Sequence, residues 1–83
     1  MTKAIVLPYT EEQNEPSAPY SKLLVLPDDE QQRNVVLKSL FSESYEVDVD
    51  EVEVRPGGEY GDFDVTDDSE YHLYITIIQE RPH

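Results

Sequence analysis

Hydrophobic and polar positions change their period along the chain, and each period predicts a different element. Residues 3–8 (Lys-Ala-Ile-Val-Leu-Pro) form a short apolar run, which predicts a strand that stops at Pro8. Residues 9–19 are polar and acidic and contain two prolines, which predicts a loop. Residues 22–26 form a second apolar run that does not alternate, so we expect a strand that is buried on both faces.

The next segment has the signals of a helix. Asp28 or Asp29 can cap the first turn, because each has a glutamine three residues further on, as in a capping box. Acidic residues in the first turn also suit the helix dipole. One apolar stripe at helical spacing should pack on the sheet, and it comprises Val36, Leu37, Leu40 and Phe41. The helix should end around residues 42–44.

From Tyr45 the hydrophobic period falls to two, which predicts a strand. Two pairs of valines alternate with acidic residues, first Val47 and Val49 and then Val52 and Val54. The second pair is out of phase with the first, so a continuous strand would turn one pair away from the core. We therefore expect a bulge or a tight bend at residues 50–51.

The rest of the chain predicts a hairpin and a last strand. Residues 55–59 (Arg-Pro-Gly-Gly-Glu) are typical of a turn, so the segments 51–55 and 59–65 should pair around it. In the second segment Phe63 and Val65 should point inward. After an acidic turn at 66–70, residues 71–79 are dense in Ile, Tyr and Thr, which favours a central strand. The order β-β-α-β-β-β predicts a single α+β domain over residues 1–83, with one helix on a mostly antiparallel sheet of four to five strands.

The net charge limits the kinds of partner. Nineteen Asp and Glu residues against six Lys and Arg give a formal charge of -13 in 83 residues. Such a chain repels nucleic acids and anionic membranes and attracts basic protein surfaces. The sequence has no cysteine, which excludes disulfides and thiolate zinc sites. It has no signal-peptide pattern and no apolar run long enough to span a bilayer, so we expect a cytoplasmic protein.

Twelve of the nineteen acids fall within residues 43–70. In a strand, side chains two residues apart lie on one face about 6.6 Å apart, close to the repeat of phosphates along an extended nucleic-acid strand. Glu46, Asp48 and Asp50 should form one such row, and Asp62 and Asp64 a second one. Tyr60 joins them because tyrosine is enriched at protein interfaces. The predicted partner-binding residues are Glu46, Asp48, Asp50, Glu51, Glu53, Glu59, Tyr60, Asp62, Asp64, Asp67, Asp68 and Glu70.

Other chemistry has weaker support in the sequence. The Asp-x-Asp pairs that begin at Asp48 and Asp62 resemble the start of a calcium loop, but neither has the glycine that an EF-hand requires at its sixth position. We therefore predict no metal site and no cofactor. His72 should be a surface residue of the last strand. No nucleophile–base arrangement and no phosphate-binding glycine loop can be identified, so we predict that the protein is not an enzyme.

The small size, the negative charge, the lack of cysteine and the acid-rich sheet resemble the DNA-mimicking inhibitors of bacteriophages. These include uracil-DNA glycosylase inhibitors, anti-restriction proteins and anti-CRISPR proteins. The resemblance is one of composition over the whole chain, and it assigns no role to any single residue. It implies that carboxylates take the place of phosphates in the basic groove of a host enzyme and exclude DNA competitively.

Three functions follow from these observations. The first is a non-enzymatic inhibitor or adaptor, monomeric or a small homo-oligomer, that binds the basic surface of a nucleic-acid-binding protein. The second is a halophilic domain whose acids only provide solubility in brine, and such a domain should unfold at low salt. The third is an accessory or structural subunit of a larger assembly, in which the acids are only solvated.

Overall fold

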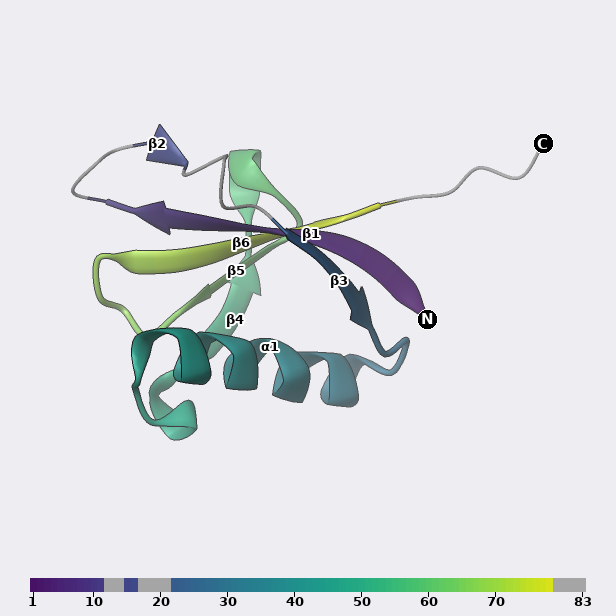
Figure 1. Cartoon of the computed structure of the whole chain (residues 1–83), viewed down its shortest axis with the longest axis horizontal. Helices are drawn as coiled ribbons and strands as arrows, with labels where there is room; N and C mark the ends of the chain where they lie inside the picture. Colours follow the sequence, from purple (N-terminus) through teal and green to yellow (C-terminus); the bar gives the residue numbers. More distant parts are fainter. Residues whose placement is uncertain (12–14, 17–21, 79–83) are drawn as a thin grey trace.

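The computed structural model describes residues 1–11, 15–16 and 22–78. Six strands form one antiparallel sheet with the order β2-β1-β6-β5-β4, and β3 pairs with the same edge of β1 as β2 does (Figure 1). The elements are β1 (Thr2–Thr10), β2 (Glu15–Pro16), β3 (Lys22–Leu26), α1 (Glu30–Tyr45), the 3₁₀ turn η2 (Val49–Glu51), β4 (Glu53–Pro56), the 3₁₀ turn η3 (Gly58–Tyr60), β5 (Phe63–Thr66) and β6 (Tyr71–Ile77). The α+β prediction, with one helix packed on an antiparallel sheet, is confirmed.

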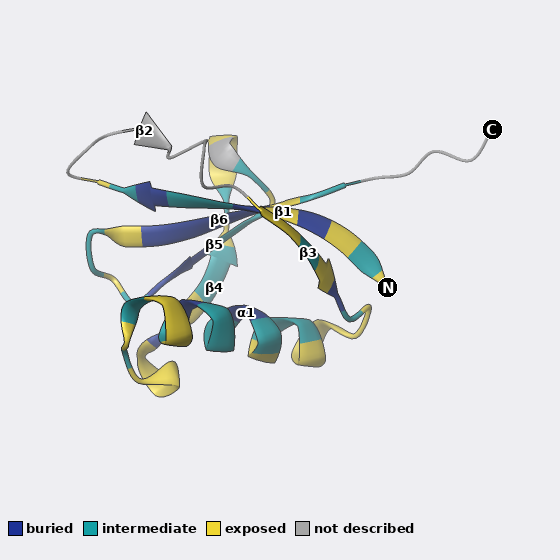
Figure 2. Cartoon of the chain, viewed as in Figure 1, coloured by how far each residue is buried: buried dark blue, intermediate teal, exposed yellow. Residues whose placement is uncertain are grey.

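The core lies between α1 and one face of the sheet (Figure 2). Leu37 and Phe41 of the helix are fully buried, and Val36 and Leu40 pack beside them, which confirms the predicted stripe. The sheet contributes buried side chains from four strands, β1, β3, β5 and β6, and from Val52 just before β4: Ala4, Val6, Leu26, Val52, Val65, Leu73 and Ile75. Among the described residues no helix covers the other face of the sheet, so its side chains are positioned by contacts within the sheet.

The helix begins where its capping residues predict. Asp29 is the N-cap, and its carboxylate accepts a hydrogen bond from the backbone N–H of Gln32 at 3.0 Å. The predicted end at 42–44 is slightly too early, because α1 continues to Tyr45. The ring of Tyr45 contacts that of Phe41 at 4.6 Å between centroids and stacks on that of Tyr71 at 4.9 Å. The extra residue thereby places an aromatic ring against the sheet.

The strand that the sequence predicts from Tyr45 to Asp50 is wrong. Glu46 ends the helix in the left-handed conformation, with φ 55°, and its N–H donates to the Ser42 carbonyl. The Ser42 hydroxyl donates to the Val47 carbonyl at 2.6 Å, which turns the chain away from strand geometry. The predicted bend at 50–51 is confirmed, since η2 lies there and β4 begins immediately after it.

Pro8 does not stop the first strand, which corrects a second prediction. β1 pairs with β6 as far as Thr10, so Tyr9 and Thr10 belong to the strand and not to the predicted loop. Glu15–Pro16, also within the predicted loop, form β2. The N–H of Glu11 donates to the Glu70 carbonyl, just before β6, so the odd-numbered residues of β1 direct their backbone groups towards β6. The even-numbered residues, Pro8 among them, face the other edge of β1, where β2 and β3 pair. On that edge the register of β3 stops opposite Val6 and that of β2 begins at Tyr9. The N–H that proline lacks would therefore have pointed between the two described partner strands, where neither β2 nor β3 pairs with it.

β3 forms where predicted, but the expectation that it is buried on both faces is wrong. Leu26 is fully buried, whereas Leu23 is 61% exposed and Val25 is 50% exposed. β3 pairs only with β1 among the strands that the structure describes, so it lies at an edge of the sheet. Its apolar residues cover the core on one face only.

The last hairpin and the central strand are confirmed. β4 pairs with β5 around the predicted turn, and β6 lies between β1 and β5. Gly57 donates its N–H to the Asp62 carbonyl at 3.1 Å, which closes the turn. A Cβ at Gly57 would lie 2.5 Å from the Gly61 carbonyl oxygen, so this tight turn requires glycine.

Candidate binding surface

One end of the molecule collects most of the acidic side chains. At this end β1 and β5 finish, β4 and β6 begin and α1 reaches its C-terminus (left side of Figure 1). The antiparallel register brings these segments together, with Thr10 opposite Tyr71 and Glu53 opposite Thr66. We call the carboxylates of this region the acidic end, and they are Glu11, Glu43, Glu46, Asp48, Asp50, Glu51, Glu53, Asp67, Asp68 and Glu70.

The acidic end contains most of the predicted partner-binding residues, but not all of them. Glu59, Tyr60 and Asp62 lie at the tip of the β4–β5 hairpin, at the other end of the sheet. Asp64 lies within β5 on the face that lacks the helix. The single surface that the sequence predicts is therefore divided among three places: the acidic end, the tip of the β4–β5 hairpin and the position of Asp64 within β5.

The first predicted row of carboxylates at strand spacing, formed by Glu46, Asp48 and Asp50, is absent from the described structure. Glu46 is the helix C-cap, Asp48 precedes η2 and Asp50 lies within it, so their spacing is that of two successive turns. Asp62 and Asp64 do flank one residue of β5, but both accept internal hydrogen bonds. The acids are concentrated by the tertiary fold, not by the repeat of a strand.

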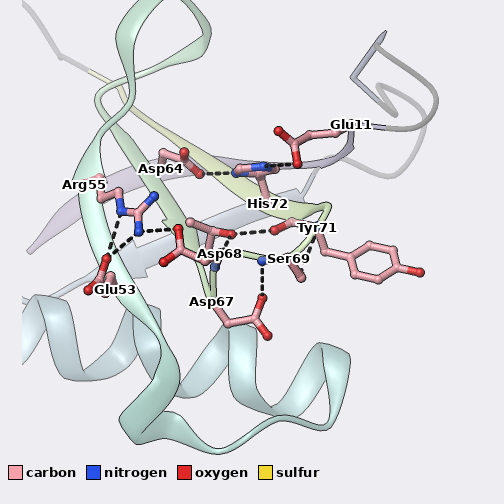
Figure 3. A network of polar contacts seen from close by, with 10 residues as sticks. Glu11, Glu53, Arg55, Asp64, Asp67, Asp68, Ser69, Tyr71 and His72 are labelled. Carbon is pink, nitrogen blue, oxygen red and sulfur yellow. Dashed lines mark hydrogen bonds and ion pairs between the residues drawn. The ribbon is translucent and has the colours of Figure 1, made fainter.

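Arg55 pairs with the acidic end at its β4 side (Figure 3). Its guanidinium donates to the Glu53 carboxylate from Nε at 2.9 Å and from Nη2 at 2.6 Å, and to the Asp68 carboxylate at 2.5 Å. The hydrogen bonds that Arg55 donates to Glu53, and then the one that it donates to Asp68, raise the pKa of Arg55 above its usual range. Two carboxylates of the acidic end are thus already committed to one cation.

Hydrogen bonds hold the acidic turn between β5 and β6 in one conformation (Figure 3). The Thr66 hydroxyl donates to the Tyr71 carbonyl at 2.8 Å and accepts from the Asp68 N–H at 3.2 Å. The Asp67 carboxylate accepts from the Ser69 N–H at 3.1 Å. Thr66 is fully buried, so the turn is anchored in the sheet and presents its acids rigidly.

Several of the predicted binding residues have such structural roles, and others do not. The Asp48 carboxylate accepts from the Asp50 N–H at 3.0 Å and caps η2. The Asp62 carboxylate accepts from the Ile77 N–H at 2.7 Å and ties the hairpin tip to β6. Five other acids of the predicted binding set form no side-chain hydrogen bond or ion pair within the described part of the chain: Glu46, Asp50, Glu51, Glu59 and Glu70.

His72 is not a surface residue, which corrects the prediction. It is 9% exposed, and its Nδ1 lies 2.9 Å from the Asp64 carboxylate (Figure 3). Its ring stacks on that of Tyr74, with 5.7 Å between the centroids. A carboxylate only accepts, so Nδ1 carries a proton. Nε2 lies 3.6 Å from Glu11 Oε2, beyond hydrogen-bonding distance. The cluster fastens β6 to β5 on the face opposite the core.

Glu11 is a member of the acidic end that the sequence did not indicate. It lies far from residues 43–70 in the chain, yet its N–H donates to the Glu70 carbonyl at 2.8 Å. Only the register between β1 and β6 places it there. The sequence does indicate that β1 and β6 are strands. It does not indicate how they pair, and so it cannot place Glu11 beside Glu70.

The described residues contain no group of three His, Cys, Asp or Glu side chains arranged to hold a metal ion. Among the same residues no helix has the length and the apolar character needed to cross a membrane. Comparison with protein-family models, with curated proteins and with solved structures found no match.

Proposed function

We propose that this protein is a non-enzymatic binding protein whose acidic end docks on the basic groove of a nucleic-acid-binding protein and blocks it. The observation that carries the proposal is the convergence of exposed carboxylates from separate elements at one end of the fold. Glu46, Asp50 and Glu51 come from the end of α1 and from η2, and all three are exposed. No described group neutralises them.

The concentration of like charge has a cost that solubility does not require. Carboxylates held near each other repel, and distributing them over the surface would reduce that repulsion at the same net charge. A basic groove removes this repulsion on binding. The negative field also steers a cationic partner towards the acidic end and accelerates association at low salt.

Rigid presentation supports binding as well. The turn that carries Asp67 and Asp68 is held by Thr66, and Asp48 caps the turn that carries Asp50. Acids fixed before binding lose little conformational entropy when the complex forms. Competition with nucleic acid follows from this chemistry, because a groove that binds phosphates offers the cations that these carboxylates need.

The test compares two double variants that change the net charge equally. Asp50→Asn with Glu51→Gln neutralises two acids of the acidic end, and Glu30→Gln with Glu59→Gln neutralises two exposed acids elsewhere. None of the four carboxylates accepts a hydrogen bond within the described structure. Charge changes at Asp48, Asp62 or Asp64 are avoided, because those side chains hold the fold.

Each variant and the unchanged protein are immobilised and exposed to a bacterial lysate from which nucleic acid has been removed. We expect a basic nucleic-acid-binding protein to be retained by the unchanged chain and by the Glu30/Glu59 variant, and to be released by added duplex DNA. The Asp50/Glu51 variant should retain much less of it. Retention that duplex DNA does not reduce would contradict the proposal. Unfolding of the unchanged protein at low salt, followed by circular dichroism, would favour a halophilic domain instead.

A further inference from the structure

The sheet has two edges, and they differ in how they are protected. β4 is the edge strand on one side, and β3, with β2 further along, forms the other side. An exposed edge offers unpaired N–H and C=O groups, and proteins usually guard it with charge or proline. The comparison between these two edges indicates which of them is built to pair.

β4 is guarded. The N–H of Gly57 bonds towards β5, so the even-numbered residues of this strand direct their backbone groups away from the sheet. Pro56 occupies one of these outward positions and has no N–H to offer. Glu53 and Arg55 add charged side chains, and the rest of the acidic end lies beside them. A second strand cannot add there favourably.

β3 is guarded only at its ends, by the exposed Lys22 at its start and by Pro27 just after it, and its middle residues carry neither charge nor proline. The N–H of Ile78 donates to the Lys3 carbonyl, so the odd-numbered residues of β1 bond to β6 and the even-numbered ones to β3. Ala4 lies opposite Leu24, so Leu24 exchanges hydrogen bonds with β1. The neighbouring residues, Leu23 and Val25, therefore direct their N–H and C=O groups to the outer edge, where no described strand pairs with them.

The same two residues carry the exposed apolar side chains of the strand. Leu23 is 61% exposed and Val25 is 50% exposed, and Ile5, directly opposite Leu23, is 39% exposed (Figure 2). These side chains lie on the face of the sheet that lacks the helix. The outward backbone groups and the apolar patch thus belong to one surface, which offers both hydrogen bonds and hydrophobic contact.

We propose that two copies of this chain pair through β3, antiparallel and about a two-fold axis at Leu24, to form one continuous sheet. In this register Leu23 of each copy lies opposite Val25 of the other, and each such pair exchanges two backbone hydrogen bonds. A shift of the axis to Val25 would place Leu23 opposite Pro27, which has no N–H to donate.

Charge also favours a second copy at this edge. A chain of net charge -13 repels another copy of itself almost everywhere. β3 contains Lys22 and no acid, and it is the edge away from Glu53 and the acidic turn. In the proposed register Lys22 lies opposite Leu26 of the second copy, next to the Asp28 and Asp29 that follow it. Asp28 already pairs with the N-terminal ammonium at 2.9 Å and Asp29 caps α1, so Lys22 adds a positive charge near acids that have partners in their own copy and lowers the repulsion at each end of the paired strands.

The experiment measures mass by sedimentation equilibrium at several protein concentrations and salt concentrations. We expect the mass to rise with concentration from 9.6 kDa towards twice that value. Salt from about 0.05 to about 0.5 M screens the repulsion between the copies and should strengthen the dimer. The complex proposed for the acidic end weakens over the same range, so either interaction can fail without the other.

Two variants and a control locate the interface. Leu23→Lys places a charge at the open edge, on a side chain that is already exposed, and should raise the dimer dissociation constant by at least about tenfold. Val25→Pro removes an outward N–H and leaves the ladder with β1 intact. Val49→Lys adds the same charge at η2, where the side chain is 40% exposed, and should leave dimerisation unchanged.

Hydrogen exchange of single amides distinguishes pairing of β3 with a second copy from pairing of β3 with another segment of the same chain. The amides of Leu23 and Val25 should become protected as the protein concentration rises, whereas the Leu24 amide should be protected at every concentration. A monomer at high concentration would overturn the proposal. So would Leu23 and Val25 amides that are protected in the dilute monomer, which would show that another segment of the same chain covers the strand.

Discussion

Substitution of Asp64 tests whether this predicted binding residue instead holds the sheet together. The Asp64 carboxylate lies 2.9 Å from His72 Nδ1, and the two side chains are 15% and 11% exposed. Asp64→Ala would remove the acceptor and leave the Nδ1–H of a buried ring without its partner. His72 Nε2 has no hydrogen bond and lies 3.6 Å from Glu11 Oε2, so the ring would gain a replacement only if this contact became shorter.

The expected loss follows from this burial. A buried donor that loses its acceptor costs about 1–3 kcal/mol of stability. In a domain of this size each kcal/mol lowers the melting temperature by about 4–8 °C, so Asp64→Ala should lower it by about 5–20 °C. Asp64→Asn keeps an oxygen acceptor and should lose less.

Thermal unfolding followed by circular dichroism at neutral pH measures the effect. Asp50→Ala is the matched control, since the Asp50 carboxylate is exposed and forms no bond within the described structure, and it should change stability by less than about 0.5 kcal/mol. Equal melting temperatures for Asp64→Ala and the unchanged protein would refute the reasoning. The bond between β5 and β6 would then contribute nothing, and Asp64 would again be open as a partner-binding residue.

Three further changes test the helix and its contacts. Asp29→Ala removes the N-cap acceptor of Gln32 and should lower the free energy of unfolding by about 1 kcal/mol in urea titrations, and Asp29→Asn should restore most of it. Phe41→Ala empties a fully buried site and should cost about 3–5 kcal/mol in the same titrations, so a loss below 1 kcal/mol would contradict the packing of α1 described here. Burial, and then the nearby Tyr71, raise the pKa of Tyr45 above 10.0, so its stabilising effect is full below that pH and is lost as pH rises through the raised value. Tyr45→Phe should therefore make stability fall less between about pH 9 and pH 11, and an unchanged slope would count against burial of this ring.

The sequence predicts the elements best where one local signal decides. The acceptor at Asp29 and the stripe that includes Leu37 and Phe41 are contained in one helix, so spacing alone locates them. The valines at 47 and 49 show how spacing fails. Their alternation is compatible with a strand, but the helix ends at Glu46 in a left-handed cap without a glycine to mark it.

Pairing across the sheet is what the sequence could not supply. Pro8 can stay in β1 because its nitrogen faces a position where no residue of the described strands pairs with it, and that depends on where β2 and β3 stop. His72 has the strand parity of a surface residue, but Tyr9 and Tyr74 contact its ring from neighbouring positions. The same limit applies to the candidate surface. Residues 43–70 hold most of its acids, and only the register adds Glu11 and separates Asp64 from the rest.

The location of binding at the acidic end is the central claim, and the salt dependence of the complex tests it most directly. The dissociation constant of the captured basic protein is measured for the unchanged chain and for the two double variants over a range of salt. At low salt the Asp50/Glu51 variant should bind about 5- to 30-fold more weakly, which corresponds to about 1–2 kcal/mol for two exposed charges, and the Glu30/Glu59 variant should bind as the unchanged chain does. The difference should disappear at about 1 M salt, where charges are screened within a few ångströms. Equal weakening of both variants would contradict the claim, because it would mean that the partner responds to the net charge and not to the acidic end.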